Sequence, residues 1–294
     1  MVTRPYPAVT ARVRISQTSL SWLLIAPALL LMSIFYLYPL VQVLLISVTE
    51  PKPGLENFAL LATSASIQRM LLTTLRICAM TTLITVVLGY VVSYAMTGGS
   101  SRLRRWTLTL VVIPMWVSAL IRAFAWVALL RRDGIINSLL VGSSVVSHPL
   151  NLVWNEFGVV IGMVHYMLPY AILPLYSNMR DIDLRYITAS RGLGASRTQT
   201  FVRVFLPLSV PGVVGAAALV AVYSLGFLVV PAILGGGKTL MVAEYVRLQI
   251  VELLNWGQGA MIAVVLLVAV IGLLGLAVWL VGPKRIFGSG EKSA

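Results

Sequence analysis

Six long apolar runs limit what this chain can fold into. They cover residues 19–49, 70–97, 106–130, 157–179, 208–234 and 257–281. A helix needs about 20 consecutive, mostly apolar residues to cross the hydrocarbon core of a bilayer. The pattern therefore predicts an all-α membrane protein with six transmembrane helices in a single domain over residues 19–282. Residues 1–18 form a leader and residues 283–294 a tail.

Composition excludes a soluble globular domain. Hydrophobic residues make up 59% of the chain and charged residues 11%, whereas soluble domains carry about 25% charged residues. The single cysteine, Cys78, lies inside an apolar run, so neither a disulfide framework nor a thiolate metal site is expected. The first run follows a basic leader, as in a signal peptide. It is much longer than a signal core of about 7–15 residues, so we interpret it as a retained membrane anchor.

The net charge of +13 reflects membrane orientation and not nucleic-acid binding. Lys and Arg near the ends of spans favour the cytoplasmic side. Basic residues gather in the segments that an N-in, C-in topology places there: Arg4, Arg12, Arg14, Arg102, Arg104, Arg105, Arg180, Arg185, Arg191, Arg197, Arg203, Lys284, Arg285 and Lys292. Both ends of the chain are therefore predicted to be cytoplasmic.

The outer connections, residues 133–156 and 235–256, are too long to be simple turns. Apolar positions over residues 242–254 recur near the helical period, which predicts a short amphipathic helix at the outer membrane surface. Such a helix can cover the bundle, or it can act as a gate or docking surface for an outside partner. Gly237-Lys238-Thr239 imitates the end of a phosphate-binding loop, but Ala232 stands where the motif needs glycine. We expect a tight turn there and no ATP binding.

The inner loop, residues 180–207, carries strong local signals. Asp183 can cap a helix that runs through Ala189, and Gly192 and Gly194 can adopt the positive φ that ends such a helix. The loop is thus expected to begin with a capped helix that stops at a glycine.

A second helix is expected to follow at once. Ser196 and Gln199 have the spacing of a capping box, while Pro207 and Pro211 predict a break before the fifth span. The product is helix–glycine–helix, with arginines projecting into the cytoplasm. A well-capped amphipathic connector is the alternative interpretation.

The inner loop resembles the cytoplasmic signature of permeases in ATP-binding-cassette (ABC) importers. That signature reads Glu-Ala-Ala, three residues, Gly, nine residues, Ile, any residue, Leu-Pro. Thr188, Ala189 and Ser190 stand at its start, and Val204 takes the Ile position. Thr188 thus replaces a glutamate that can make charged contacts with the ATPase. The resemblance implies an ATPase-coupling site formed by Asp183, Thr188, Ala189, Ser190, Arg191, Gly194, Ala195, Leu206 and Pro207.

Other segments are similar to the spermidine/putrescine importer permeases, in particular the first of the two permease subunits. They are residues 114–116, 120–122, 133–137, 168–169, 173–176, 234–238 and 256–257. The resemblance implies the type I ABC importer permease (MetI-like) fold in a bacterial inner membrane. It also implies a chain without enzymatic activity or cofactor of its own.

The implied partners are a second permease subunit, two ABC ATPase subunits that bind ATP, and an extracytoplasmic solute-binding protein, in contact with membrane lipid. The implied mechanism is alternating access, in which the helix at 183–191 transmits ATPase movement. Related families import ferric ion, aminoethylphosphonate or opines, so an anionic or zwitterionic solute is an alternative to a polyamine. A secondary carrier is a further alternative, although the two halves show no internal repeat.

Arg122 is a charge inside the third run and therefore a candidate functional residue. It can line the pathway, where it would suit an anion, or pair with a neighbour and fix the span. Aromatic faces suit a cationic substrate, and Trp116, Tyr166, Tyr170 and Tyr223 are the candidate pathway aromatics. These rings can equally serve packing. His165 is expected to be a hydrogen-bonded core residue, and the spans offer poor material for an intramembrane enzyme.

Overall fold

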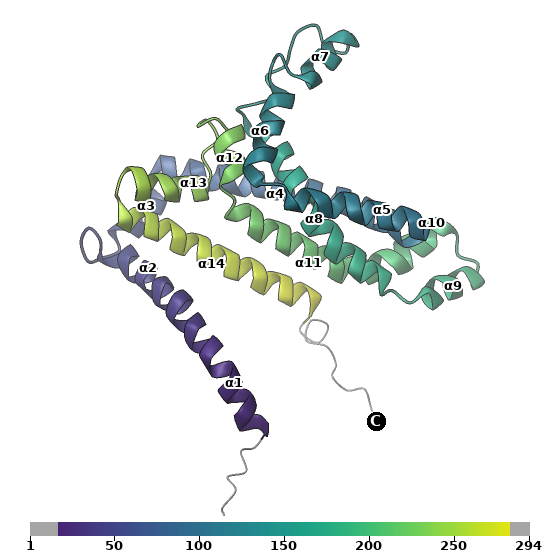
Figure 1. Cartoon of the computed structure of the whole chain (residues 1–294), viewed down its shortest axis with the longest axis horizontal. Helices are drawn as coiled ribbons and strands as arrows, with labels where there is room; N and C mark the ends of the chain where they lie inside the picture. Colours follow the sequence, from purple (N-terminus) through teal and green to yellow (C-terminus); the bar gives the residue numbers. More distant parts are fainter. Residues whose placement is uncertain (1–16, 283–294) are drawn as a thin grey trace, which may run out of the picture.

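The computed structural model describes residues 17–282, in which every regular element is a helix (Figure 1). Segments 1–16 and 283–294 lie outside the described residues, and with them the basic residues of the leader and the tail. Five helices are long and apolar enough to span a membrane: Ser21–Thr49, Ala65–Gly98, Glu156–Arg180, Arg197–Leu225 and Trp256–Val281. A bent pair of helices provides a sixth span if the two helices cross the membrane together.

The core is built from α4 (Ala65–Gly98), α8 (Glu156–Arg180) and α11 (Leu206–Leu225). Small residues let α4 and α8 approach closely, since a Cβ on Gly89 would lie 3.1 Å from that of Ala171. Ser93 Oγ also donates to the Ile172 carbonyl at 3.1 Å. Without water, such packing and hydrogen bonds hold membrane helices together. These three helices therefore form the packed core to which the functional segments attach.

The first span stands outside this core. It runs through α1 (Gln17–Met32), a π-helical turn (Ser33–Leu37) and α2 (Tyr38–Thr49). Helix α14 (Trp256–Val281) packs along α2, and most of the large apolar side chains of the first span are exposed. An apolar surface of that size faces lipid or another protein.

The predicted third span is wrong as a single straight helix. The chain forms α5 (Ser101–Val112), a 3₁₀ turn (Ile113–Trp116) and α6 (Ala119–Leu130), with a bend of 102° between the two halves. Pro114 lacks the backbone donor that a continuing helix needs. The Ser118 hydroxyl then accepts a hydrogen bond from Leu120 N at 3.3 Å and begins a new helix.

The fifth span begins and ends earlier than predicted. One helix runs from Arg197 to Leu225 as α10 (Arg197–Thr200), a π-helical turn (Phe201–Phe205) and α11; α12 (Val229–Leu234) is a separate helix. The predicted break at Pro207 and Pro211 is therefore wrong. Pro207 follows directly on the π-helical turn, whose wider hydrogen-bond spacing accommodates the ring within the continuous helix.

Short helices gather at one end of the bundle, opposite α9 (Leu184–Gly192) and α10 (Figure 1). They include α3 (Glu56–Thr63), α12 and α13 (Val242–Arg247), which a π-helical turn extends to Glu252. This confirms the amphipathic helix predicted from residue 242. Val242 N donates to the buried Thr74 Oγ1 of α4 at 3.0 Å, so one face of that helix covers the bundle.

The tight turn predicted near Lys238 is also present. Gly236 has φ +55° and Gly237 φ +72°, in the left-handed region that favours glycine. The glycines therefore shape a turn between α12 and α13.

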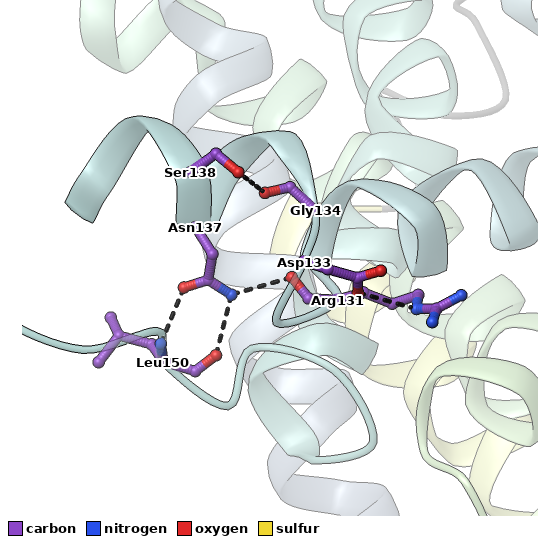
Figure 2. A network of polar contacts seen from close by, with 6 residues as sticks. All are labelled: Arg131, Asp133, Gly134, Asn137, Ser138 and Leu150. Atoms are coloured by element: carbon purple, nitrogen blue, oxygen red, sulfur yellow. Dashed lines mark hydrogen bonds and ion pairs between the residues drawn. The ribbon is translucent and has the colours of Figure 1, made fainter. Parts of the chain in front are cut away.

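The outer arm, residues 131–156, extends from the bundle and contains α7 (Ile135–Gly142). Its centre is Asn137, whose side chain is fully buried. Asn137 Nδ2 donates to the carbonyls of Arg131 and Leu150, each at 3.0 Å, and Asn137 Oδ1 accepts from Leu150 N at 2.8 Å (Figure 2). One side chain thus joins the start of the arm to its returning segment.

Candidate functional site

The inner loop has the predicted helix–glycine–helix form. Asp183 Oδ1 accepts from Arg185 N at 2.9 Å and caps α9. The helix ends with Gly194 N donating to the Arg191 carbonyl at 2.9 Å. Gly194 has φ +84°, whereas Gly192 is the last residue of α9 itself. Only the second of the two predicted glycines therefore takes the left-handed conformation.

The second helix begins with the predicted capping box. Gln199 N donates to Ser196 Oγ at 3.2 Å, and Ser196 N donates to Gln199 Oε1 at 2.9 Å. The hydroxyls of Ser190 and Thr200 lie 3.1 Å apart and share a hydrogen bond between the two helices. Ser190 stands where the ABC permease signature has alanine, which lacks a hydroxyl and could not form this hydrogen bond. Sequence analysis missed the contact because nothing in the spacing pairs these residues.

The surface of the inner loop is exposed and mixed in character. The exposed fraction is 72% for Leu184, 58% for Tyr186 and 89% for Leu193. Thr188 is also exposed, but its hydroxyl donates back to the Leu184 carbonyl at 3.1 Å. Exposed apolar side chains rimmed by charge are typical of a protein-binding surface. Within the predicted coupling set, residues 183–195 share this surface, whereas Leu206 and Pro207 lie further along, in the spanning helix.

Four of the five predicted pathway residues come together in a second place. Tyr166 and Tyr170 of α8 are stacked, with ring centroids 6.2 Å apart, and Tyr170 lies 4.9 Å from Tyr223 of α11. Sequence analysis missed Phe227, whose ring is 4.4 Å from that of Tyr166. We call these four rings the aromatic cluster. Phe227 reaches it because α11 ends two residues earlier and the chain turns back.

Arg122 packs against the same cluster. Its guanidinium carbon lies 3.9 Å from the centroid of the Tyr166 ring, a cation–π geometry. The side chain is only 8% exposed, and its Nε and Nη1 atoms have no hydrogen-bond partner within the described residues. The guanidinium thus occupies an aromatic face that a cationic solute would otherwise use.

Trp116 and His165 differ in their surroundings: Trp116 is exposed, whereas His165 is hydrogen-bonded to a neighbouring helix. Trp116 is 88% exposed in the 3₁₀ turn before α6 and makes no ring contact with the aromatic cluster among the described residues. His165 Nδ1 accepts a hydrogen bond from Trp126 Nε1 at 3.2 Å, in agreement with the predicted core role. The structure therefore separates Trp116 from the other candidate pathway residues.

Comparison with known proteins agrees with this architecture. A family model described as binding-protein-dependent transport system inner membrane component matches residues 85–281. The spermidine/putrescine transport system permease protein PotB of Salmonella typhimurium (strain SL1344) is 32% identical over 225 residues, which are 76% of this chain and 78% of that protein. The protein of the same name from Haemophilus influenzae is 35% identical over 183 residues, which are 62% of this chain and 64% of its own.

A solved structure shows the same fold at low identity. It is a chain of a bacterial alginate ABC transporter in complex with an alginate pentasaccharide-bound periplasmic protein. The TM-score is 0.73 at 17% identity, covering 88% of this chain and 92% of that one. The MetI-like permease fold, the helical bundle and the family match together place the protein in the inner membrane as a multi-pass transport subunit that is not itself an enzyme. The chain belongs to the family of binding-protein-dependent transport system inner membrane components.

Proposed function

We propose that this chain is the permease subunit of an ATP-driven importer of a polyamine, spermidine or putrescine. The observation that carries the proposal is its identity of 31–35% to permeases named for these solutes, over most of the chain in several of them. The proposed importer contains a second permease subunit, two ABC ATPase subunits that bind the ATP, and an extracytoplasmic solute-binding protein. No nucleic acid takes part.

The inner loop is the proposed docking surface for the ATPase. Its two helices are capped by their own side chains and joined by the Ser190–Thr200 contact, so the loop can enter a groove as a formed unit. Closure of the ATPases would move this unit and the helix that continues from it. With threonine in place of the signature glutamate, docking depends on Leu184, Tyr186 and the arginines of the loop and not on an acidic side chain at position 188.

The aromatic cluster is the proposed contact for the ammonium groups of the solute. Tyr223 is 46% exposed and Tyr170 is half-buried, so part of each ring is accessible, and cations bind such faces. The described spans hold two carboxylates, and both pair with an arginine of this chain: Glu156 at the start of α8 with Arg76, and Asp133 after α6 with Arg131. Any carboxylates that the cation needs in the membrane must therefore come from the second permease subunit.

Arg122 has a positioning role in this proposal. It holds the Tyr166 ring through the cation–π contact and leaves Tyr170 and Tyr223 to the solute. The alternative, an anionic or zwitterionic solute that binds Arg122 directly, is favoured by the two unpaired guanidinium nitrogens. The relatives' names and the buried position of the side chain favour the first interpretation.

Uptake into vesicles that contain the whole transporter tests the proposal. Excess spermidine or putrescine should abolish uptake of labelled polyamine, whereas aminoethylphosphonate and an opine should not. Tyr170→Leu should reduce uptake more than Tyr170→Phe, because phenylalanine keeps the aromatic face. Arg122→Gln should reduce assembly or stability, with any remaining uptake unchanged in selectivity. Strong competition by one of the anions, together with normal assembly of Arg122→Gln and loss of anion uptake, would contradict the polyamine proposal.

A further inference from the structure

A basic cavity of about 390 Å³ lies between the inner loop and the helical bundle. Four arginines from four different elements line it: Arg104 of α5, Arg180 of α8, Arg191 of α9 and Arg197 of α10. None of these guanidinium groups forms an ion pair within the part of the chain that the structure describes. The cavity therefore concentrates positive charge, and residues 17–282 provide no acidic partner for it.

The other residues that line this cavity are mostly apolar or aromatic. They include Tyr94, Met179, Ile187, Phe201 and Phe205. A site for a small, fully hydrated anion does not need apolar lining of this kind. Four arginines together with an apolar lining suit an amphiphile with an anionic head.

Helices α4, α5 and α8 line this basic cavity and also a second, apolar cavity of about 470 Å³. On α4 the lining moves from residues 94–98 in the basic cavity to residues 88–92 in the apolar one. On α5 it moves from Arg104 to residues 107–111 and then to Pro114 in the 3₁₀ turn that follows. On α8 it moves from residues 176–180 to residues 165–172. Along each helix the apolar cavity thus lies further from the inner loop and deeper in the span.

We propose that this pair of cavities binds an anionic phospholipid of the cytoplasmic leaflet. The phosphate group lies among the four arginines and an acyl chain follows the apolar cavity between α4, α5 and α8. Basic pockets between membrane helices on the cytoplasmic side bind anionic head groups such as that of cardiolipin. The position agrees, because α4 and α8 end at this cavity and the basic residues place that end in the cytoplasm.

Apolar contacts already join the inner loop to the bundle, since Ile187 packs against the cluster that includes Met179, and the bound lipid would add a charged connection. Arg104 lies on α5 and Arg180 ends α8, whereas Arg191 and Arg197 lie on the short helices α9 and α10. One phosphate group bound by all four holds the loop in a defined orientation for the ATPase. Anionic lipid should therefore raise the uptake obtained per ATP hydrolysed.

The chain offers a matched control within a single helix turn. Arg104 is half-buried at the cavity, whereas Arg102 and Arg105 are exposed and do not line it. Arg104→Gln, Arg102→Gln and Arg105→Gln each remove one positive charge from the same surface. A second probe, Leu110→Trp, fills part of the apolar cavity and changes no charge.

The experiment uses the whole transporter in nanodiscs of zwitterionic phospholipid with graded amounts of phosphatidylglycerol or cardiolipin. Native mass spectrometry measures retained anionic lipid, and uptake per ATP is measured in vesicles of the same composition. Arg104→Gln should bind the lipid about fivefold more weakly, since one arginine near a membrane surface contributes about that factor. Leu110→Trp should also lose lipid, whereas Arg102→Gln and Arg105→Gln should match the unchanged protein.

Three outcomes would overturn the proposal. Equal lipid retention by all charge variants would mean that only general surface charge attracts lipid. Displacement of the lipid by millimolar inorganic phosphate would identify a site for free phosphate. Loss of the ATPase subunits from Arg104→Gln in nanodiscs without anionic lipid would identify an acidic segment of the ATPase as the occupant. The lipid measurement does not depend on which solute is transported.

Discussion

The inner loop and the outer arm each connect two spanning segments, but different kinds of contact stabilise them. In the inner loop the stabilising bonds join close neighbours: Asp183 to Arg185 N, and Ser196 to Gln199 in both directions. In the outer arm the buried side chain of Asn137 reaches Leu150, thirteen residues away (Figure 2). One region is capped locally and leaves its surface free, whereas the other is closed around a buried amide.

This difference indicates what each region can do without unfolding. A loop whose caps are internal can change its place against a partner and keep its shape, as a docking element must. A segment closed by a buried amide keeps its shape only while all three of its hydrogen bonds persist, since unpaired buried polar groups are costly. The inner loop is therefore suited to movement as a unit and the outer arm to a fixed form.

The largest effect is expected from breaking the outer closure. Asn137→Ala leaves the Arg131 and Leu150 carbonyls and Leu150 N without their partner. Unsatisfied buried groups of this kind cost about 1–3 kcal/mol, so the arm should open locally. Hydrogen exchange in the purified transporter should rise over residues 143–151. Ser138→Ala is the control, because Ser138 Oγ donates only to the Gly134 carbonyl within the same helix; equal exchange in both variants would remove the contrast between the two regions.

A second substitution tests the form of the inner loop. Gly194→Val places a β-branched residue at φ +84°, and strain of about 1–3 kcal/mol should redirect α10 relative to α9. Gly192→Val is the control, because a Cβ there meets open space and φ is not positive. Gly194→Val should reach the membrane but lose most coupled uptake and co-purification of the ATPase, while Gly192→Val keeps far more of both. Normal uptake by Gly194→Val would show that the loop does not depend on this turn.

The smallest effect concerns Glu244 on the outer helix that covers the bundle. Burial raises the pKa of this carboxyl, the nearby Arg247 opposes the rise and Glu252 adds to it. Because the pKa is higher in the folded state, folding favours the protonated form. The associated stabilisation is complete below the pKa of an unfolded glutamate and is lost as the pH rises through the raised value.

Glu244→Gln should therefore flatten the dependence of thermal stability on pH, because the neutral amide stays uncharged throughout. Melting temperatures of the purified transporter between about pH 4 and about pH 8, a range that brackets the titration of a raised glutamate, would show it. Glu56→Gln, at an exposed position of α3, serves as the control, because Glu56 does not contribute to the shift of Glu244. A pH profile of Glu244→Gln that matches the unchanged protein would show that this carboxyl contributes nothing to the stability of the outer surface.

Sequence reasoning succeeded where the physics is local. The Asp183 cap, the Ser196–Gln199 box and the glycine turn involve residues within a few positions of each other, and the apolar runs depend only on composition. It failed where distant residues decide the outcome. Pro207 looks like a helix breaker until the π-helical turn before it is known, and Pro114 with Ser118 bends a run that is long enough for one straight span.

The outer arm and the aromatic cluster show the same limit. Asn137 has no local signal for its contact with Leu150, which lies thirteen residues further along the chain. Phe227 joins the aromatic cluster only because α11 ends at Leu225. Such tertiary contacts have no period or spacing in the sequence.

The continuous helix Arg197–Leu225 connects the inner loop directly to the aromatic cluster. At a rise of about 1.5 Å per residue the helix is about 43 Å long. Its cytoplasmic end carries the capping box, and Tyr223 lies two residues before its other end, against Tyr170. For a helix of this length, a tilt of about 10° about one end moves the opposite end by about 7 Å. The distance between the Tyr170 and Tyr223 rings therefore reports the position of the cytoplasmic end of this helix.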